Sequence, residues 1–230
     1  DFPVYAHGGN SSSRKKMDIH SLLAGVTSER LVEYDFVARN LVSRRKRTKI
    51  LDIGAGGAGL AQAIGEFGGG GWQVVGIDII EGGCDVRMDA RFAGFADGAF
   101  DQIISISTIE HIGLFSGAID DLGDLKAMQE IFRILDKAGS AIITVPYGKL
   151  ATTVRQEYRV YDRRALGRLV CQFLVAKKEF YRYNSGKWLR CSQRVAERGG
   201  DGYVPAKFHS GACACLLLKK KGRKLQRHGN

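Results

Sequence analysis

The chain has 230 residues, of which 44% are hydrophobic and 26% are charged, and these values are ordinary for one soluble globular domain. Its formal net charge at pH 7 is +11. Apolar runs such as residues 212–218 are far shorter than the roughly 20 residues that a membrane helix needs, which argues against a membrane span.

The first predicted segment is a flexible arm over residues 1–27, which is polar and glycine-rich and carries no secretory signal. The chain begins with Asp1, not Met, which leaves open whether a native segment precedes it. A helix is predicted next, over residues 28–42, with Thr27 or Ser28 as its cap. Its apolar residues recur three and four positions apart: Leu31, Tyr34, Val37, Ala38 and Leu41.

A predicted strand over residues 49–53 runs into a glycine-dense turn, and a helix over residues 60–67 follows. A strand, a turn of this kind and a helix together present backbone N–H groups and a helix N-terminus to a ligand. Gly54-x-Gly56-x-x-Gly59 fits the dinucleotide fingerprint, and Asp78 ends the next strand, 19 positions after Gly59. On this pattern alone the ligand is NAD.

A second interpretation depends on Asp52, which precedes Gly54 by two positions. Asp-x-Gly-x-Gly resembles the first motif of class I S-adenosylmethionine (SAM)-dependent methyltransferases. The match departs at Ala58, where that family has its third glycine, so the choice between the two cofactors stays open at this point. The resemblance implies that Asp78 accepts hydrogen bonds from the cofactor's ribose hydroxyls, and that the cofactor contacts are Asp52, Gly54, Ala55, Gly56, Asp78 and Ile79.

A short third strand is predicted over residues 84–86, and Asp89-Ala90-Arg91 comes soon after it. Together with the Phe-x-Asp-x-x-Phe-Asp series over residues 95–101, this resembles the same methyltransferase family. The resemblance implies that Asp89 receives the adenine amine while Met88 and Ala90 flank the ring. The alternative is that Asp89 only forms a turn.

The fourth strand, over residues 102–107, ends in Ser107-Thr108-Ile109-Glu110-His111-Ile112-Gly113. Glu-His-Ile-Gly at this place is common in small-molecule methyltransferases. An amphipathic helix from residue 124, a turn near residue 139 and a fifth strand over residues 140–145 continue the resemblance, which covers residues 28–146. It implies a Rossmann-like α/β fold with a seven-stranded, mostly parallel sheet, an antiparallel seventh strand and helices on both faces. A nicotinamide dehydrogenase has no reason to carry this series.

Beyond residue 150 the prediction is a helix capped by Asp162, a strand over residues 173–183, and a strand over residues 187–191 that pairs back as a hairpin. A polar loop over residues 194–207 and an apolar strand over residues 211–218 follow. The methyltransferase domain thus spans residues 28–218, and residues 219–230 form a basic tail. Thr-Val-Pro-Tyr-Gly at residues 144–148, Arg-Val-Tyr-Asp at 159–162 and Gly-x-Trp at 186–188 resemble a bacterial and archaeal group of methyltransferases linked to glycan or surface-polysaccharide synthesis.

Methyl transfer requires alignment of donor and acceptor and, for a hydroxyl acceptor, removal of a proton. His111 is the candidate base, because its unperturbed pKa lies near neutrality and it follows the fourth strand at the ligand-binding edge of the sheet. Alternatively, it only packs beside the cofactor. Ser107 and Glu110 are predicted to contact the cofactor, and Glu110 could instead orient His111. Three residues after strand five are predicted to bind the acceptor, although surface or packing roles remain open: Tyr147, Arg159 and Tyr161.

The predicted acceptor is a hydroxyl of a small molecule or glycan, and the charge distribution favours an anionic one. Residues 51–150 carry 14 acidic and 6 basic residues, whereas residues 151–230 carry 5 acidic and 19 basic residues. RNA therefore remains a second acceptor class, and a non-catalytic binding module is a third reading. The five cysteines have no metal-type spacing, which predicts reduced thiols, no metal and a cytoplasmic protein.

Overall fold

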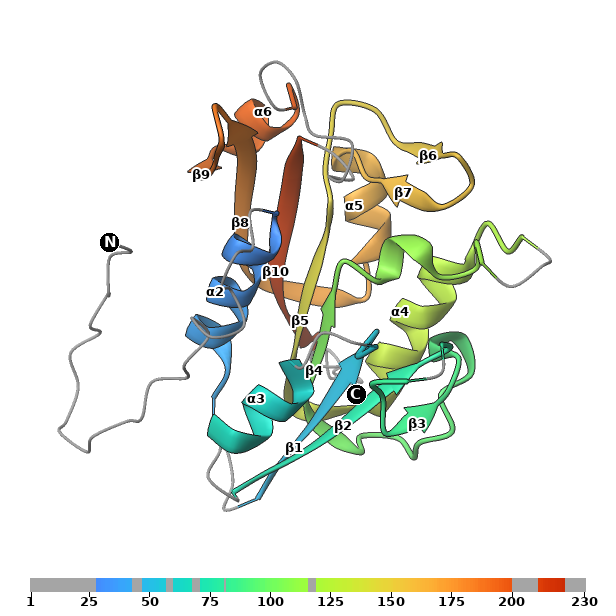
Figure 1. Ribbon diagram of the computed structural model, residues 1–230. Helices are drawn as coiled ribbons and strands as arrows, with labels where there is room; N and C mark the ends of the chain where they lie inside the picture. Colours follow the sequence, from blue (N-terminus) through green and yellow to red (C-terminus); the bar gives the residue numbers. More distant parts are fainter. Residues whose placement is uncertain are drawn as a thin grey trace, which may run out of the picture.

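The computed structural model describes residues 28–42, 47–56, 60–67, 71–80, 82–115, 119–199 and 211–221. Within them, one large sheet carries helices on both faces (Figure 1). The strand order is β3-β2-β1-β4-β5-β10-β8-β9. The predicted arm over residues 1–27 and most of the basic tail lie outside the described residues.

The centre of the sheet is parallel. Its strands are β1 (Thr48–Ile53), β2 (Trp72–Asp78), β4 (Phe100–Ile106) and β5 (Leu135–Pro146). β1 pairs in parallel with β2 on one side and with β4 on the other. All seven residues of β4 are buried, as expected for a strand covered on both faces.

Helices cover both faces of this sheet (Figure 1). Buried residues of α2 (Arg30–Asn40) and α3 (Leu60–Phe67) belong to one core cluster with Ile50. Those of α4 (Gly123–Ile134) and α5 (Arg163–Leu169) belong to a second core cluster with Leu51. Neighbouring side chains of a strand point to opposite faces, so the apolar run of β1 supplies both cores.

The predicted helix caps have different outcomes. α2 begins at Arg30 after Glu29, and the backbone N–H of Arg30 donates to the Ser28 hydroxyl at 3.3 Å. Thr27 lies outside the described residues. The N-cap at Asp162 is confirmed, because its carboxylate accepts a hydrogen bond from the Ala165 backbone N–H at 2.7 Å.

The C-terminal strands confirm the predicted topology but not the strand count. β10 (Ala212–Lys220) runs antiparallel between β5 and β8 (Phe173–Asn184), as predicted for the seventh strand. β9 (Lys187–Cys191) pairs with β8 through the predicted hairpin and thereby becomes an eighth strand. The hairpin closes at Ser185 and Gly186, whose φ values of 46° and 86° suit a tight two-residue turn.

Several short elements differ from the predictions. The structure adds the hairpin β6 (Thr152–Val154) and β7 (Tyr158–Val160), the 3₁₀ turns η1 (Ala90–Phe92) and η2 (Ile109–His111), and the helix α6 (Gln193–Ala196). The third strand, β3 (Val86–Arg87), has only two residues. Elements this short depend on tertiary contacts, so local sequence patterns predict them poorly. No helix in the described ranges is long and apolar enough to cross a bilayer.

Candidate functional site

A cavity of about 340 Å³ opens at the carboxyl ends of β1, β2 and β4. This is the edge at which open α/β sheets bind ligands. Nine of the predicted site residues line it: Asp52, Gly54, Gly56, Asp78, Ile79, Asp89, Ala90, Ser107 and His111. Segments far apart in the sequence thus converge on one space.

Two glycines line the cavity at points where the backbone passes close to the side chain of another cavity residue. Gly54 has a φ of 84°, and a Cβ at this position would lie 2.0 Å from Thr108 Oγ1. A Cβ on Gly56 would lie 2.7 Å from Asp78 Oδ2, which accepts the Gly56 backbone N–H at 3.0 Å. The positive φ of Gly54 therefore favours glycine, and a side chain at Gly56 would displace the Asp78 carboxylate. Ala58 and Gly59, where the motif departs from the family pattern, lie outside the described residues.

The acids at the ends of β1 and β2 differ in their surroundings. Asp78 accepts the Gly56 and Ile80 backbone N–H groups, which hold its carboxylate at the rim of the turn. Asp52 is only 3% exposed. Burial, together with the charge of Asp78, raises the pKa of Asp52 to about 7. Both carboxylates line the cavity, which suits a cationic or hydroxyl-bearing ligand.

Asp89 occupies the place predicted for the adenine contact, and it is also bound within the chain. Its carboxylate accepts hydrogen bonds from the Arg91 backbone N–H at 2.9 Å and from Arg91 Nη2 at 2.7 Å. Burial alone would raise the pKa of Asp89, but the hydrogen bonds from Arg91 lower it. Met88 and Ala90, the predicted flanking residues, also line the cavity. Asp89 is therefore both a turn former and a cavity residue.

Ser107 directly follows β4 and has a left-handed backbone conformation, with a φ of 41°, which is uncommon for a residue with a side chain. Its backbone N–H donates to Thr144 Oγ1 at 3.0 Å, and its hydroxyl donates to Glu33 Oε1 at 2.7 Å. These bonds from β5 and α2 fix the turn that leads to His111.

His111 lines the cavity, and the β6–β7 hairpin determines its tautomer. Nδ1 lies 2.7 Å from the backbone carbonyl oxygen of Glu157. A carbonyl oxygen can only accept, so Nδ1 carries the proton and Nε2 is the basic nitrogen of the neutral ring. Burial lowers the pKa of His111 below its ordinary value, although the Glu157 carbonyl opposes this effect. The ring is therefore neutral, with a basic nitrogen, at pH 7.

Glu110 does not line the cavity, in contrast to the prediction that it contacts the cofactor. Its side chain is 0% exposed, and Oε1 lies 3.9 Å from His111 Nε2. Burial raises the pKa of Glu110 well above its ordinary value, which favours the neutral carboxyl. Its position beside Nε2 is compatible with the alternative, in which Glu110 orients His111. Ala55 also lies elsewhere, in the wall of the larger cavity described below.

The three residues predicted to bind the acceptor are buried and make internal hydrogen bonds. Tyr147 accepts from Gln193 Nε2, and Tyr161 donates to Asp124. Arg159 is 9% exposed, and its guanidinium donates to the backbone carbonyls of Glu110, Ile112 and Asp120. Arg159 therefore holds the segment that carries His111, and the placement of these three residues gives no support to acceptor binding.

Other cavity residues were missed by the sequence analysis: Arg30, Tyr34, Arg91, Thr108 and Phe115. Two of them lie on α2, a helix that the family resemblance predicted to help cover the site, although no residue of it was named as a contact. The helical period of Leu31 and Tyr34 identified one apolar face, but no local pattern shows which end of a helix meets a cavity.

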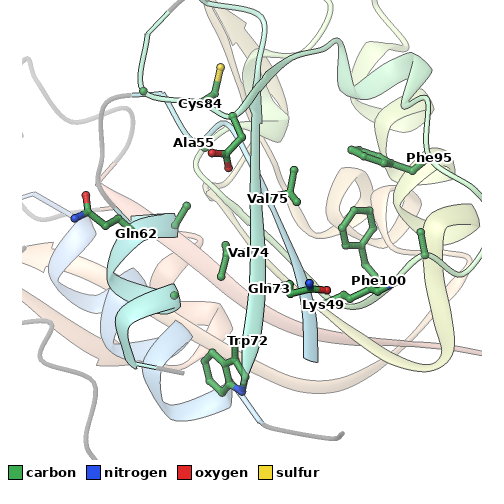
Figure 2. Close-up of a pocket in the computed structure, with 15 residues that line it drawn as sticks. Lys49, Ala55, Gln62, Trp72, Gln73, Val74, Val75, Cys84, Phe95 and Phe100 are labelled. Atoms are coloured by element: carbon green, nitrogen blue, oxygen red, sulfur yellow. The ribbon is translucent and has the colours of Figure 1, made fainter. Parts of the chain in front are cut away.

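A larger hollow, of about 1130 Å³, surrounds the free edge of β2 (Figure 2). Gln62 and Trp72 lie on one side of the strand, and Phe95 and Phe100 lie on the other (Figure 2). A link of seven residues joins β2 to the two-residue β3. The described residues of this link form no helix that would cover the cavity. The larger hollow has none of the convergent cavity residues Asp52, Asp78 and His111, so the smaller cavity is the candidate site.

Comparisons with known proteins agree with this geometry at the level of the fold. A family described as "Caenorhabditis protein of unknown function, DUF268" matches residues 84–184. No curated protein matches the chain.

Solved structures resemble the whole domain. The PH0226 protein from Pyrococcus horikoshii OT3 has a TM-score of 0.55 at 17% identity, covering 90% of this chain and 95% of that chain. A SAM-dependent methyltransferase from Methanosarcina mazei has a TM-score of 0.54 at 14% identity, covering 80% and 96%. The cyclase SpnF has a TM-score of 0.56 at 16% identity, covering 89% and 93%. The chain thus has the fold of class I SAM-dependent methyltransferases. The cyclase shows that this likeness does not define the reaction.

Proposed function

We propose that the protein binds SAM in the 340 Å³ cavity and transfers the methyl group to a hydroxyl of a small molecule or glycan. The observation that carries the proposal is the convergence of Asp78, Asp89 and His111 on one cavity. The carboxylates belong to Asp78 at the end of β2 and to Asp89 after β3. The basic imidazole nitrogen belongs to His111, which follows β4.

The residues present fit this cofactor. Because Gly56 has no Cβ, the Asp78 carboxylate can lie beside the glycine turn. There it can accept hydrogen bonds from ribose hydroxyls. Met88 and Ala90 offer apolar surface for the adenine ring, and Asp89 can accept from its amine while it still holds Arg91. Asp52 faces the cationic part of the ligand.

The bound cofactor supplies an electrophilic methyl group on a sulfonium ion. In the proposed reaction, His111 Nε2 accepts the proton of the acceptor hydroxyl, while Nδ1–H remains on the Glu157 carbonyl. The ring becomes an imidazolium and later returns the proton to solvent.

RNA is the second candidate acceptor, supported by the 19 basic residues of positions 151–230. Three cations of this region and of α2 are engaged by Glu179, however: Arg39, Lys177 and Arg190. RNA binding in the micromolar range that weakens with salt would favour this acceptor. Methylation of a sugar-type acceptor without RNA retention would oppose it.

An NAD-dependent oxidoreductase is less well supported, because the sixth strand of the dinucleotide-binding fold joins the fifth in parallel. Here the antiparallel β10 stands between β5 and β8.

All five cysteines are free thiols, which is compatible with the cytoplasmic location that we include in the proposal.

Calorimetric titration with S-adenosylhomocysteine, with NAD in a parallel titration, tests the proposal. We expect micromolar binding of S-adenosylhomocysteine and none of NAD. Binding of NAD alone would overturn the methyltransferase assignment. Binding of S-adenosylhomocysteine without methyl transfer from SAM to any lysate component would favour a non-catalytic binding module.

A further inference from the structure

Arg30 is a cation in a cavity whose other charged walls are mainly acidic. The side chain is 29% exposed and lines the cavity together with Asp52 and Asp78. The other cavity arginine, Arg91, is engaged by the carboxylates of Asp89 and Asp120. Arg30 therefore differs from Arg91 in what its guanidinium can still bind.

The guanidinium of Arg30 is held on one edge only. Nη1 donates to Glu33 Oε2 at 2.5 Å, and a guanidinium has five N–H donors. Among the residues that the structure describes, no other acceptor receives a hydrogen bond from this guanidinium. The remaining donors thus suit an anionic group of a ligand, since guanidinium and carboxylate pair in bidentate geometry.

Glu33 fixes the orientation of Arg30 before any ligand binds. Its side chain is 0% exposed, and its second oxygen accepts the Ser107 hydroxyl at 2.7 Å. The carboxylate therefore has one position, between β4 and its own helix. Burial alone would lower the pKa of Arg30, but the charge and the hydrogen bond of Glu33 raise it. The guanidinium is a preorganised, permanent cation.

The position of Arg30 along the cavity indicates which part of the ligand it meets. Arg30 donates to Glu33, and Glu33 accepts the hydroxyl of Ser107, the residue that leads from β4 toward η2, so Arg30 lies at this end of the cavity wall. If the adenosine lies against the two aspartates, the amino-acid end of the cofactor extends toward α2. That end carries an ammonium and a carboxylate.

We propose that Arg30 binds the carboxylate at the amino-acid end of the cofactor and that Asp52, which lines the same cavity, binds the ammonium. The inference rests on the proposed function and adds a residue that recognises the zwitterion. Arg30, Tyr34 and Asp52 line the same cavity. An anionic acceptor is the other source of the same chemistry, and the test separates the two.

The test compares two ligands on Arg30→Gln by calorimetry. S-adenosylhomocysteine contains the amino-acid end, whereas 5′-methylthioadenosine has the same adenosine and a thioether without it. Loss of a charge-assisted hydrogen bond predicts a roughly 10- to 100-fold weaker affinity for S-adenosylhomocysteine. The affinity for 5′-methylthioadenosine should not change, and this arm also shows that the variant is folded. Arg30→Lys should recover part of the lost affinity.

Arg168→Gln is the matched control, because Arg168 is exposed on α5 and the same charge is removed away from the cavity. Equal weakening of both ligands in Arg30→Gln would overturn the proposal, since the effect would then not depend on the carboxylate. Unchanged binding of both would also overturn it and would assign the guanidinium to an anionic acceptor. Absence of S-adenosylhomocysteine binding in the wild-type protein would overturn the proposed function as well.

Discussion

Replacement of Asp52 by asparagine should stabilise the protein, and the gain should increase with pH. Asp52 is 3% exposed, and burial is the largest influence on its carboxyl group. Burial and the nearby charge of Asp78 raise its pKa to about 7, whereas an aspartate in an unfolded chain has a pKa of about 3.9. Above pH 4 the unfolded state therefore loses this proton first, and folding becomes less favourable as pH rises toward 7.

The magnitude follows from the separation of the two pKa values. Each unit corresponds to about 1.4 kcal/mol, so the buried acid costs about 4 kcal/mol of stability at pH 8 and about 1.5 kcal/mol at pH 5. Asparagine has nearly the same shape and does not ionise. The stability of Asp52→Asn relative to wild type should therefore be about 2 to 3 kcal/mol greater at pH 8 than at pH 5.

Urea unfolding of both proteins at the two pH values measures this difference. Asp121→Asn, at an exposed position, is the control and should show no comparable pH dependence. A relative stability of Asp52→Asn that is the same at pH 5 and pH 8 would refute the argument that Asp52 is buried as an unfavourable charge.

The same substitution should weaken ligand binding, because the ionised acid attracts the ammonium of the cofactor. In the wild-type protein, the affinity for S-adenosylhomocysteine should rise as pH increases through about 7, where Asp52 ionises. In Asp52→Asn this rise should disappear. Greater stability together with poorer binding would identify a site at which function costs stability. A wild-type affinity that does not change between pH 5 and pH 8 would contradict this role.

Three further predictions concern the cavity. His111→Ala should lower turnover about 100-fold while the affinity for S-adenosylhomocysteine changes little, because only the proton acceptor is lost; near-wild-type turnover on the true acceptor would exclude the base role. Asp78→Ala should weaken S-adenosylhomocysteine binding about tenfold in calorimetry, since the ribose hydroxyls lose a charged acceptor, and an unchanged affinity would contradict the site. Gly54→Ala should destabilise the fold by about 1 to 3 kcal/mol in urea unfolding, because its φ of 84° and the contact with Thr108 exclude a side chain; a wild-type midpoint would show that the turn can rearrange.

The sequence by itself determined the parallel half of the sheet and much of the cavity. Apolar runs ending at Asp52, Asp78 and Ser107 predicted strands that end at one edge, and the structure brings these residues together. Such a prediction succeeds because the carboxyl ends of parallel strands meet by topology alone, so each residue after a strand is placed by its local pattern. The antiparallel direction of the last strand was instead predicted from the resemblance to the methyltransferase family.

Only the tertiary structure decided what the remaining polar side chains do. Arg159 looked like a ligand-binding residue in the sequence, but its guanidinium holds the carbonyls of Glu110 and Ile112. Conversely, Arg30 belongs to a helix with no recognised motif, and Glu33 directs it into the cavity. The tautomer of His111 depends on a backbone carbonyl at Glu157, which any residue type would supply. The sequence specifies which groups can be charged or donate a proton, whereas burial and the partners brought by the fold decide which of them still face a ligand.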